Sequence, residues 1–179
     1  MTEKVLYTKT VFSGKVLSVS RDAIQMETGA ETIREIVHHP GGACIAAVSD
    51  DYDVYMVRQP RYAFHEKLLE LPAGKLEAGE DPEIAARREL AEEVGLGARE
   101  WSLLHRVYPT VGYSDEVIYC YLARGLYPHV EQPDFDEDIT VEKMPLDDAL
   151  GMVMDGRIRD AKTAVCILKL ARMRSEGTL

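Results

Sequence analysis

The first part of the chain alternates apolar and polar positions and shows no helical period. Between residues 4 and 37, short stretches rich in β-branched and aromatic residues are separated by Ser13-Gly14 and Thr28-Gly29, which are typical turn pairs. This pattern predicts a small antiparallel sheet of about three strands. A sheet of that size is too small to be stable alone. We therefore expect it to pack against the rest of the chain or against a second subunit.

The pattern changes beyond residues 38–42, which read HHPGG and mark a junction. The continuous apolar run at 43–49 is typical of a strand that is buried on both faces. Two helices are predicted near the end of the chain, at about 146–154 and 161–174. Further strands are predicted at 54–57, 67–72, 103–108, 116–123 and 139–144.

A third helix is predicted between Asp81 and Gly95. Asp81 can accept hydrogen bonds from the first turn, Pro82 suits the first helical position, and Gly95 is a common helix stop. Apolar residues spaced four apart place one stripe of this helix against a sheet. The stripe consists of Ala86, Leu90 and Val94.

Composition and charge limit the classes of partner. The chain has 179 residues, of which 46% are hydrophobic and 29% are charged, as in ordinary globular domains. A formal net charge of −10 argues against a nucleic-acid partner, because phosphate contacts need a basic surface. No apolar run approaches the length of about 18 residues that a membrane span needs, and the N-terminus lacks the apolar core of a signal peptide. We expect a cytoplasmic protein with neither a nucleic-acid nor a membrane partner.

The chain contains three cysteines and two adjacent histidines, residue types that can bind metal ions. Cys44, Cys120 and Cys166 each lie in an apolar run, at wide and unpatterned spacings. Such cysteines are typical of reduced thiols in a core, and we interpret them this way rather than as zinc ligands or catalytic groups. His38 and His39 are neighbours on an extended segment, where successive side chains point to opposite sides. We therefore do not expect them to share a metal ion.

The predicted helix carries carboxylates that crowd toward its C-terminal end. Glu89 and Glu93 are four positions apart and Glu92 is three from Glu89, so the three share one region of the helix surface. Their mutual repulsion and the helix dipole both disfavour this arrangement. One interpretation is a solvated acidic face softened by Arg87 and Arg88. The other is a site for Mg²⁺, which prefers carboxylate oxygens and would offset both penalties.

The loop before the helix contains Gly74, whose conformational freedom would let a neighbouring backbone carbonyl complete a metal site. From Gly74, five residues lead to Glu80, and seven more lead to residues 88–96, which read RELAEEVGL. These residues match the Nudix box at every fixed position, so the chain resembles the Nudix hydrolases. The resemblance implies an α/β/α sandwich with a mixed sheet, preceded here by the small N-terminal antiparallel sheet. It also implies hydrolysis of a nucleoside diphosphate linked to another group.

The resemblance implies a role for each residue of the box. Glu89 and Glu93 would be the principal ligands of Mg²⁺ or Mn²⁺. Glu92 would be a further ligand with a part in catalysis, and Ala73 would contribute its carbonyl oxygen. Arg88 would belong to the catalytic machinery by orienting the glutamates.

Stretches on both sides of the box resemble ADP-ribose pyrophosphatases. They are FSGKV at 12–16, REIVHHPGG at 34–42, VRQPRY at 57–62, ELPAGKLEAGE at 70–80, GYSDE at 112–116 and DAKTA at 160–164. This resemblance implies cleavage of ADP-ribose to AMP and ribose 5-phosphate, with other nucleoside diphosphate sugars as further substrates. Two alternatives stay open: a Nudix hydrolase of nucleoside triphosphates or dinucleoside polyphosphates, and a domain that senses ADP-ribose without turnover.

The same resemblance suggests which residues would bind the substrate. Arg58 and Arg61 would bind its phosphates, and Glu116 would contact ribose or metal. The general base would come from the acidic loop at 131–138, and we choose Glu137 because it lies just before the next predicted strand. The alternatives in this loop are Glu131, Asp136 and Asp138.

The resemblance extends to assembly. ADP-ribose pyrophosphatases commonly form a homodimer in which the N-terminal strands reach over the partner. We therefore divide the chain into residues 1–40, for dimerisation and substrate covering, and residues 41–179, the Nudix hydrolase domain. A partner subunit would also support an N-terminal sheet that is too small to stand alone.

Overall fold

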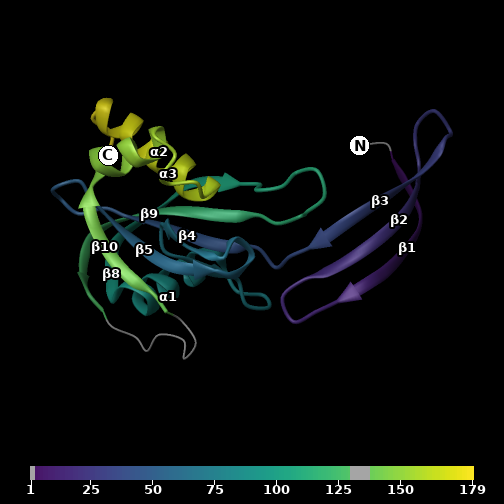
Figure 1. Ribbon diagram of the computed structural model, residues 1–179, viewed down its shortest axis with the longest axis horizontal. Coiled ribbons are helices and arrows are strands. Elements are labelled where there is room, and N and C mark those ends of the chain that lie inside the picture. The colour runs from purple at the N-terminus through teal and green to yellow at the C-terminus, as the bar shows by residue number, and fades with distance from the viewer. Residues whose placement is uncertain (1–2, 130–137) are drawn as a thin grey trace. The chain divides into compact units, whose positions relative to one another are not determined.

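The computed structural model describes residues 3–129 and 138–179. The chain divides into two compact units (Figure 1). The first consists of Met1–Gly41 and Tyr108–Val117, and the second of Gly42–Val107 and Ile118–Leu179. Residues 108–117 thus join the N-terminal unit, although the sequence places them in the predicted hydrolase domain. The roles of residues 1–40 in dimerisation and substrate covering stay predictions.

The first unit contains an antiparallel sheet in the order β1-β2-β3, formed by β1 (Lys4–Ser13), β2 (Ser18–Gln25) and β3 (Glu31–His38). Strand β2 continues through polar Arg21 and Asp22, which pair with both of its neighbours. Every residue of β1 is exposed. This strand therefore presents large apolar side chains to solvent, namely Val5, Leu6, Tyr7, Val11 and Phe12.

The second unit is built on a four-stranded mixed sheet in the order β7-β4-β9-β8. Its strands are β4 (Gly42–Ala47), β7 (Ala73–Lys75), β8 (Leu96–Val107) and β9 (Ile118–Pro128). Strands β4 and β9 run parallel, whereas the β4–β7 and β8–β9 pairs are antiparallel. A further sheet, in the order β10-β5-β6, consists of β5 (Asp53–Arg61), β6 (Glu66–Glu70) and β10 (Thr140–Pro145), with the short 3-10 helix η1 (Tyr62–Phe64) between β5 and β6.

Helices cover the two faces of the mixed sheet: α1 (Pro82–Val94) on one side, and α2 (Leu146–Met154) and α3 (Ala161–Ser175) on the other (Figure 1). Strand β4 explains the two layers, because its side chains alternate between the faces. Ala43 and Ile45 pack in a core with Leu90 of α1. Cys44 and Ala46 pack in the other core with Ile167 and Leu170 of α3. The predicted α/β/α sandwich with a mixed sheet and a separate antiparallel sheet is confirmed.

Helix α1 begins and ends where the local signals in the sequence predict. The Asp81 carboxylate accepts hydrogen bonds from the backbone N–H groups of Glu83 and Ile84, and Gly95 closes the helix in the left-handed region with φ of 73°. Leu90 of the predicted stripe is fully buried. None of the helices among residues 3–129 and 138–179 is long and apolar enough to span a membrane.

Candidate active site

Strand β7 and helix α1 bring two glutamates into direct contact with the backbone of Ala73 and Gly74. The Ala73 N–H donates a hydrogen bond of 2.9 Å to Oε2 of Glu93. A Cβ atom at Gly74 would lie 1.9 Å from Oε1 of Glu89, so only glycine leaves room for this carboxylate. Glu89 and Glu93 are each only 7% exposed. The fold therefore holds two nearly buried carboxylates against the Ala73–Gly74 backbone.

Arg88 contacts three carboxylates, two on helix α1 and one just before it. Its Nη1 donates to Oε1 of Glu89 at 2.7 Å and to Oε2 of Glu92 at 2.9 Å, and its Nε and Nη2 each lie 3.1 Å from a Glu80 oxygen. The hydrogen bonds with Glu80, followed by the charge of Glu89, raise the pKa of Arg88. The same hydrogen bond lowers the pKa of Glu80. One guanidinium thus contacts three carboxylates and offsets part of their negative charge, which agrees with the orienting role expected of the box arginine.

The donor set suits a hard divalent cation, because it combines several carboxylates with backbone carbonyl oxygens of the adjoining Ala73–Gly74 segment. In the arrangement that Arg88 holds, the three glutamates do not bring all their ligand atoms within 4.8 Å of one another; in the described part of the chain, only a cysteine group does so. Metal binding would therefore require at least one of these carboxylates to move toward the others. The low exposure of Glu89 and Glu93 means that such an ion would be shielded from bulk water.

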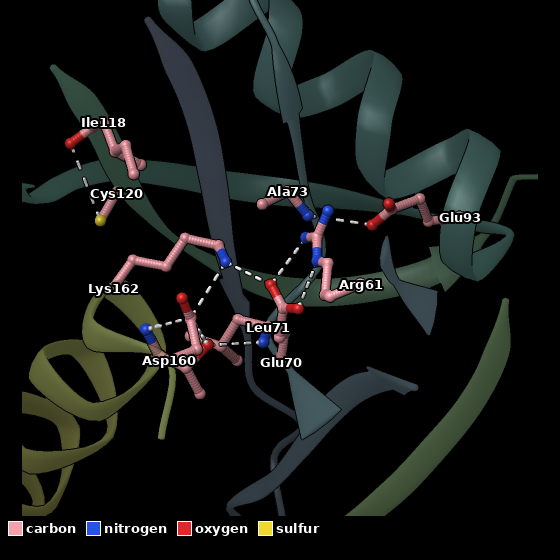
Figure 2. Close-up of polar contacts among 10 residues, drawn as sticks. Arg61, Glu70, Leu71, Ala73, Glu93, Ile118, Cys120, Asp160 and Lys162 are labelled. Atoms are coloured by element: carbon pink, nitrogen blue, oxygen red, sulfur yellow. Dashed lines mark hydrogen bonds and ion pairs between the residues drawn. The ribbon is translucent and has the colours of Figure 1, made fainter. Parts of the chain in front are cut away.

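A second charged group lies beside this cluster. Arg61 at the end of β5 pairs with Glu70 of β6 through Nε–Oε1 and Nη2–Oε2 contacts of 2.6 and 2.7 Å. This pair raises the pKa of Arg61, and the charge of Glu93 adds to the effect. Figure 2 shows the Arg61 guanidinium reaching from Glu70 toward Ala73 and Glu93. Arg61 therefore links the buried Glu70 to the carboxylate cluster.

Glu70 is held from its other side by Lys162 of α3. The carboxylate is 2% exposed, and the Lys162 Nζ lies 2.5 Å from its Oε2 (Figure 2). Burial raises the pKa of Glu70, but the hydrogen bond from Arg61 and the charge of Lys162 lower it more, so the pKa lies below its usual value. Burial alone would lower the pKa of Lys162, but Asp160, Cys44 and Glu70 raise it.

Asp160 completes this network at the start of α3. Its Oδ2 accepts hydrogen bonds from Lys162 Nζ at 2.9 Å and from the hydroxyl of Thr163 at 2.5 Å. The Thr163 hydroxyl in turn accepts from the Leu71 N–H at 2.9 Å. The sequence reasoning did not assign a role to Glu70, Asp160 or Lys162. The available signals were that Glu70 opens one ADP-ribose-pyrophosphatase-like stretch and that Asp160 and Lys162 lie in another.

The network forms one wall of a cavity of about 370 Å³. This volume is within the range of pockets that hold small molecules, roughly 300–1,000 Å³. Arg61 belongs both to the cavity lining and to the pair beside Glu93. The lining residues are Arg61, Phe64, Glu66, Leu68, Glu70, Arg159, Asp160, Ala161 and Lys162.

The other predicted substrate residues have partners of their own. Arg58 pairs with Glu142 of β10 at 2.6 Å. Glu116 belongs to the first unit, where its carboxylate lies 3.3 Å from Nδ1 of His39. The other histidine of the junction, His38, contacts Asp115 at 2.5 Å.

The predicted general base, Glu137, lies outside the described residues, as do its alternatives Glu131 and Asp136. Asp138 is described and forms an exposed ion pair of 2.7 Å with Lys67.

Comparisons with known proteins identify the family. Residues 37–164 match the model of the NUDIX domain. An ADP-ribose pyrophosphatase of Bacillus subtilis is 39% identical over 169 residues, which are 93% of this chain and 91% of that protein. A methanol dehydrogenase activator of Bacillus methanolicus is 36% identical over 167 residues, covering 92% of this chain and 90% of the other. A solved structure described as an ADP compounds hydrolase has the same fold, with a TM-score of 0.87, 20% identity, and coverage of 100% of this chain and 98% of that chain.

The matched NUDIX region contains the Gly74 loop, the helix α1 and its glutamates, and it extends to the Asp160–Lys162 network. The sequence interpretation of the box and the likeness of the fold thus lead to one conclusion, that this chain belongs to the NUDIX domain family.

Proposed function

We propose that the protein is a Mg²⁺-dependent pyrophosphatase that hydrolyses ADP-ribose to AMP and ribose 5-phosphate. The observation that carries the proposal is the complete box on β7 and α1, with Glu89 and Glu93 nearly buried against the Ala73–Gly74 backbone. The likeness to the ADP-ribose pyrophosphatase of Bacillus subtilis, along nearly the whole chain, supports this choice of substrate. Other nucleoside diphosphate sugars would share the site.

Members of the NUDIX family generally need a divalent metal, and we propose Mg²⁺, with Mn²⁺ as a substitute. Glu89, Glu92, Glu93 and the carbonyl of Ala73 would hold it. When bound, the ion would supply positive charge for the phosphate oxygens and would lower the pKa of the attacking water. Arg88 would keep the glutamates in place before binding, since it already contacts two of them.

Cationic side chains would hold the diphosphate. Glu70 engages Nε and Nη2 of Arg61, so the guanidinium is fixed while its Nη1 is not used by this pair. A fixed arginine loses little conformational freedom when it binds phosphate, which favours precise orientation of the substrate. We propose that Arg61 binds a phosphate, that Arg58 assists, and that the adjoining cavity receives the sugar. Glu116 would contact ribose or metal, in agreement with the resemblance.

The proton of the attacking water would pass to a carboxylate of the acidic loop. Glu137 is our choice for this general base, with Glu131, Asp136 and Asp138 as the alternatives. Variants of these four residues, assayed for kcat across pH, would identify the base. Removing it should lower kcat and abolish the acidic limb of the pH profile.

We also propose that the protein is a homodimer that acts in the cytoplasm. The exposed apolar side chains of β1 support the first part, because a run of such residues marks an interaction surface. The three cysteines, all in the reduced form, are compatible with the second part.

The central test uses purified protein, ADP-ribose and Mg²⁺, with products separated by chromatography. We expect AMP and ribose 5-phosphate from the wild type, loss of activity in EDTA, and a severe loss in Glu93→Gln. Glu100→Gln is the matched control, since Glu100 is an exposed residue of β8. If Glu93→Gln were as active as Glu100→Gln, the assignment of α1 to catalysis would be wrong.

Two alternatives can be separated in the same assay. Faster turnover of nucleoside triphosphates or dinucleoside polyphosphates than of ADP-ribose would change the substrate class but keep the site. A regulatory role is favoured by one observation, the similarity to a protein described as a methanol dehydrogenase activator. Tight calorimetric binding of ADP-ribose without any product would support a sensing domain instead.

A further inference from the structure

All three cysteines of the chain meet at one place in the core of the second unit. Cys44 lies on β4, Cys120 on β9 and Cys166 on α3. Their sulfur atoms all lie within 4.8 Å of one another, and all three residues are buried. The Nudix box and the substrate residues discussed above do not use them. The convergence of the chain's only cysteines from three separate elements is therefore a feature that the proposed hydrolysis does not explain.

The fold fixes this convergence. Strands β4 and β9 are parallel neighbours, and Cys44 is paired directly with Cys120, so the two side chains point to the same face of the sheet. Helix α3 packs on that face, and Cys166 belongs to the same core cluster as both strand cysteines. The three thiols are held by rigid elements and not by a loop, as a preorganised site requires.

We propose that Cys44, Cys120 and Cys166 form a three-sulfur binding site for a soft d¹⁰ metal cation, with Cu(I) as the best match. Thiolate sulfur selects soft cations, whereas Mg²⁺ prefers the oxygen ligands found around Glu89. A metal–sulfur bond of about 2.3 Å in a planar three-coordinate site implies sulfur–sulfur distances of about 4.0 Å. The three sulfur atoms lie within 4.8 Å of one another, so this geometry is compatible with the observed group.

The number of ligands favours Cu(I) over zinc. Structural zinc sites almost always have four protein ligands. Within residues 3–129 and 138–179, no histidine or carboxylate joins the three sulfurs as a fourth member of the group. A cation that is satisfied by three sulfur ligands fits this set better than one that needs four.

Charge and access also fit a cation site. Lys162 precedes Cys166 by one helical turn on α3, where its ammonium group pairs with Glu70 and Asp160. A positive charge close to cysteines favours their thiolate form, which is the form that binds metal. Lys162 also lines the cavity of about 370 Å³, so one turn of helix separates this opening from Cys166. Local opening of that turn would admit the metal.

The test is a titration of the full-length chain, reduced and freed of metal, with Cu(I) under anaerobic conditions. A chromophoric Cu(I) chelator reports how much metal the protein withholds. We expect one tightly held Cu(I) per chain, a sulfur-to-metal charge-transfer band that saturates at one equivalent, and a higher melting temperature. X-ray absorption should show about three sulfur neighbours at about 2.3 Å.

The variants separate the site from accidental binding. Cys166→Ala and Cys166→Ser should each weaken Cu(I) binding by at least about 100-fold, which is the upper end of what loss of a group that only orients a ligand costs. Glu93→Gln should bind Cu(I) like the wild type, which keeps this result separate from the proposed hydrolysis. Circular dichroism without metal checks that each variant is folded. Failure of the wild type to withhold Cu(I) overturns the proposal, as does wild-type affinity in a folded Cys166 variant; either result would make the group a packing cluster of thiols.

Discussion

Arg61 and Glu70 form a two-bond ion pair, with Nε–Oε1 and Nη2–Oε2 distances of 2.6 and 2.7 Å, at the border between the cavity and the carboxylate cluster. Glu70 is almost completely buried, whereas the side chain of Arg61 is partly exposed. The buried member therefore orients the accessible one. This relationship supports a division of labour in which Glu70 is a positioning residue and Arg61 is the group that meets the substrate.

Arg61→Lys should lower kcat/KM for ADP-ribose by about 10- to 100-fold, because an ammonium group cannot reproduce the planar two-bond geometry. The charge is retained, so a smaller loss would mean that Arg61 acts only through its charge. Steady-state kinetics with ADP-ribose measures the effect. Arg157→Lys is the control, since Arg157 also pairs with a carboxylate, that of Asp155, but is not part of the cavity lining.

Glu70→Gln should destabilise the protein by about 3 kcal/mol, because it leaves the buried Lys162 ammonium without its closest carboxylate. The matched change Glu66→Gln removes a carboxylate from an exposed pair and should cost less than about 1 kcal/mol. Urea denaturation of both variants gives the two free energies of unfolding. Equal losses in the two variants would show that the buried Glu70 network stabilises the protein no more than an exposed ion pair does.

The pH dependence of stability should change in the same variant. The pKa of Glu70 in the folded chain lies below its usual value, mainly because Arg61 and Lys162 oppose the effect of burial. As the pH falls below about 4.3, the unfolded chain takes up a proton at this position before the folded chain does. The Glu70 contribution is therefore complete above that pH and is lost as the pH falls through the folded-state pKa. Unfolding measured from pH 6 to pH 3 should show a shallower loss of stability in Glu70→Gln than in the wild type.

Gly74→Ala should reduce activity strongly while it affects folding little. The added Cβ would overlap the Glu89 carboxylate, which is the end of a flexible side chain and can move away. Displacement of a metal ligand by about 1 Å is enough to lower the rate by about 100-fold. The control is Gly151→Ala in α2, where a Cβ meets no atom within 4 Å and should be neutral or stabilising. Activity and melting temperature, measured together, distinguish the two effects; an active Gly74→Ala would argue against Glu89 as a ligand.

Tyr7→Asp should weaken the homodimer, since it puts a charge among the exposed apolar side chains of β1. We expect a shift from dimer to monomer in sedimentation experiments at micromolar concentration. Met154→Asp, at an exposed position of α2, is the control for the added charge. A Tyr7→Asp variant that sediments like this control would remove β1 from the interface.

The sequence predicted features that depend on nearby residues. Asp81, Pro82 and Gly95 delimit α1 through contacts within a few positions, and the structure confirms both ends. The family also followed from a local pattern, because the box occupies one loop and one helix. The small N-terminal antiparallel sheet of about three strands also followed from local turn pairs, and the structure contains it as β1, β2 and β3.

Contacts between distant segments could not be predicted in this way. Glu70 and Lys162 are 92 positions apart, and nothing near either residue indicates that its partner is buried with it. The cysteines were interpreted as separate core residues, and the buried environment agrees with that interpretation. Their proximity depends on the parallel register of β4 and β9, which no local pattern specifies.

The position of β4 between two partners has a consequence for how the protein tolerates change. Cys44 pairs with Ala73 of the box loop on one edge and with Cys120 on the other. The strand cannot shift by one residue to suit one neighbour without losing its alignment with the other, and such a shift would also exchange the side chains of the two cores. Insertions or deletions within Gly42–Ala47 should therefore be far more damaging than those in the exposed turns. These six residues fix the position of β7 relative to the helices on both faces of the sheet.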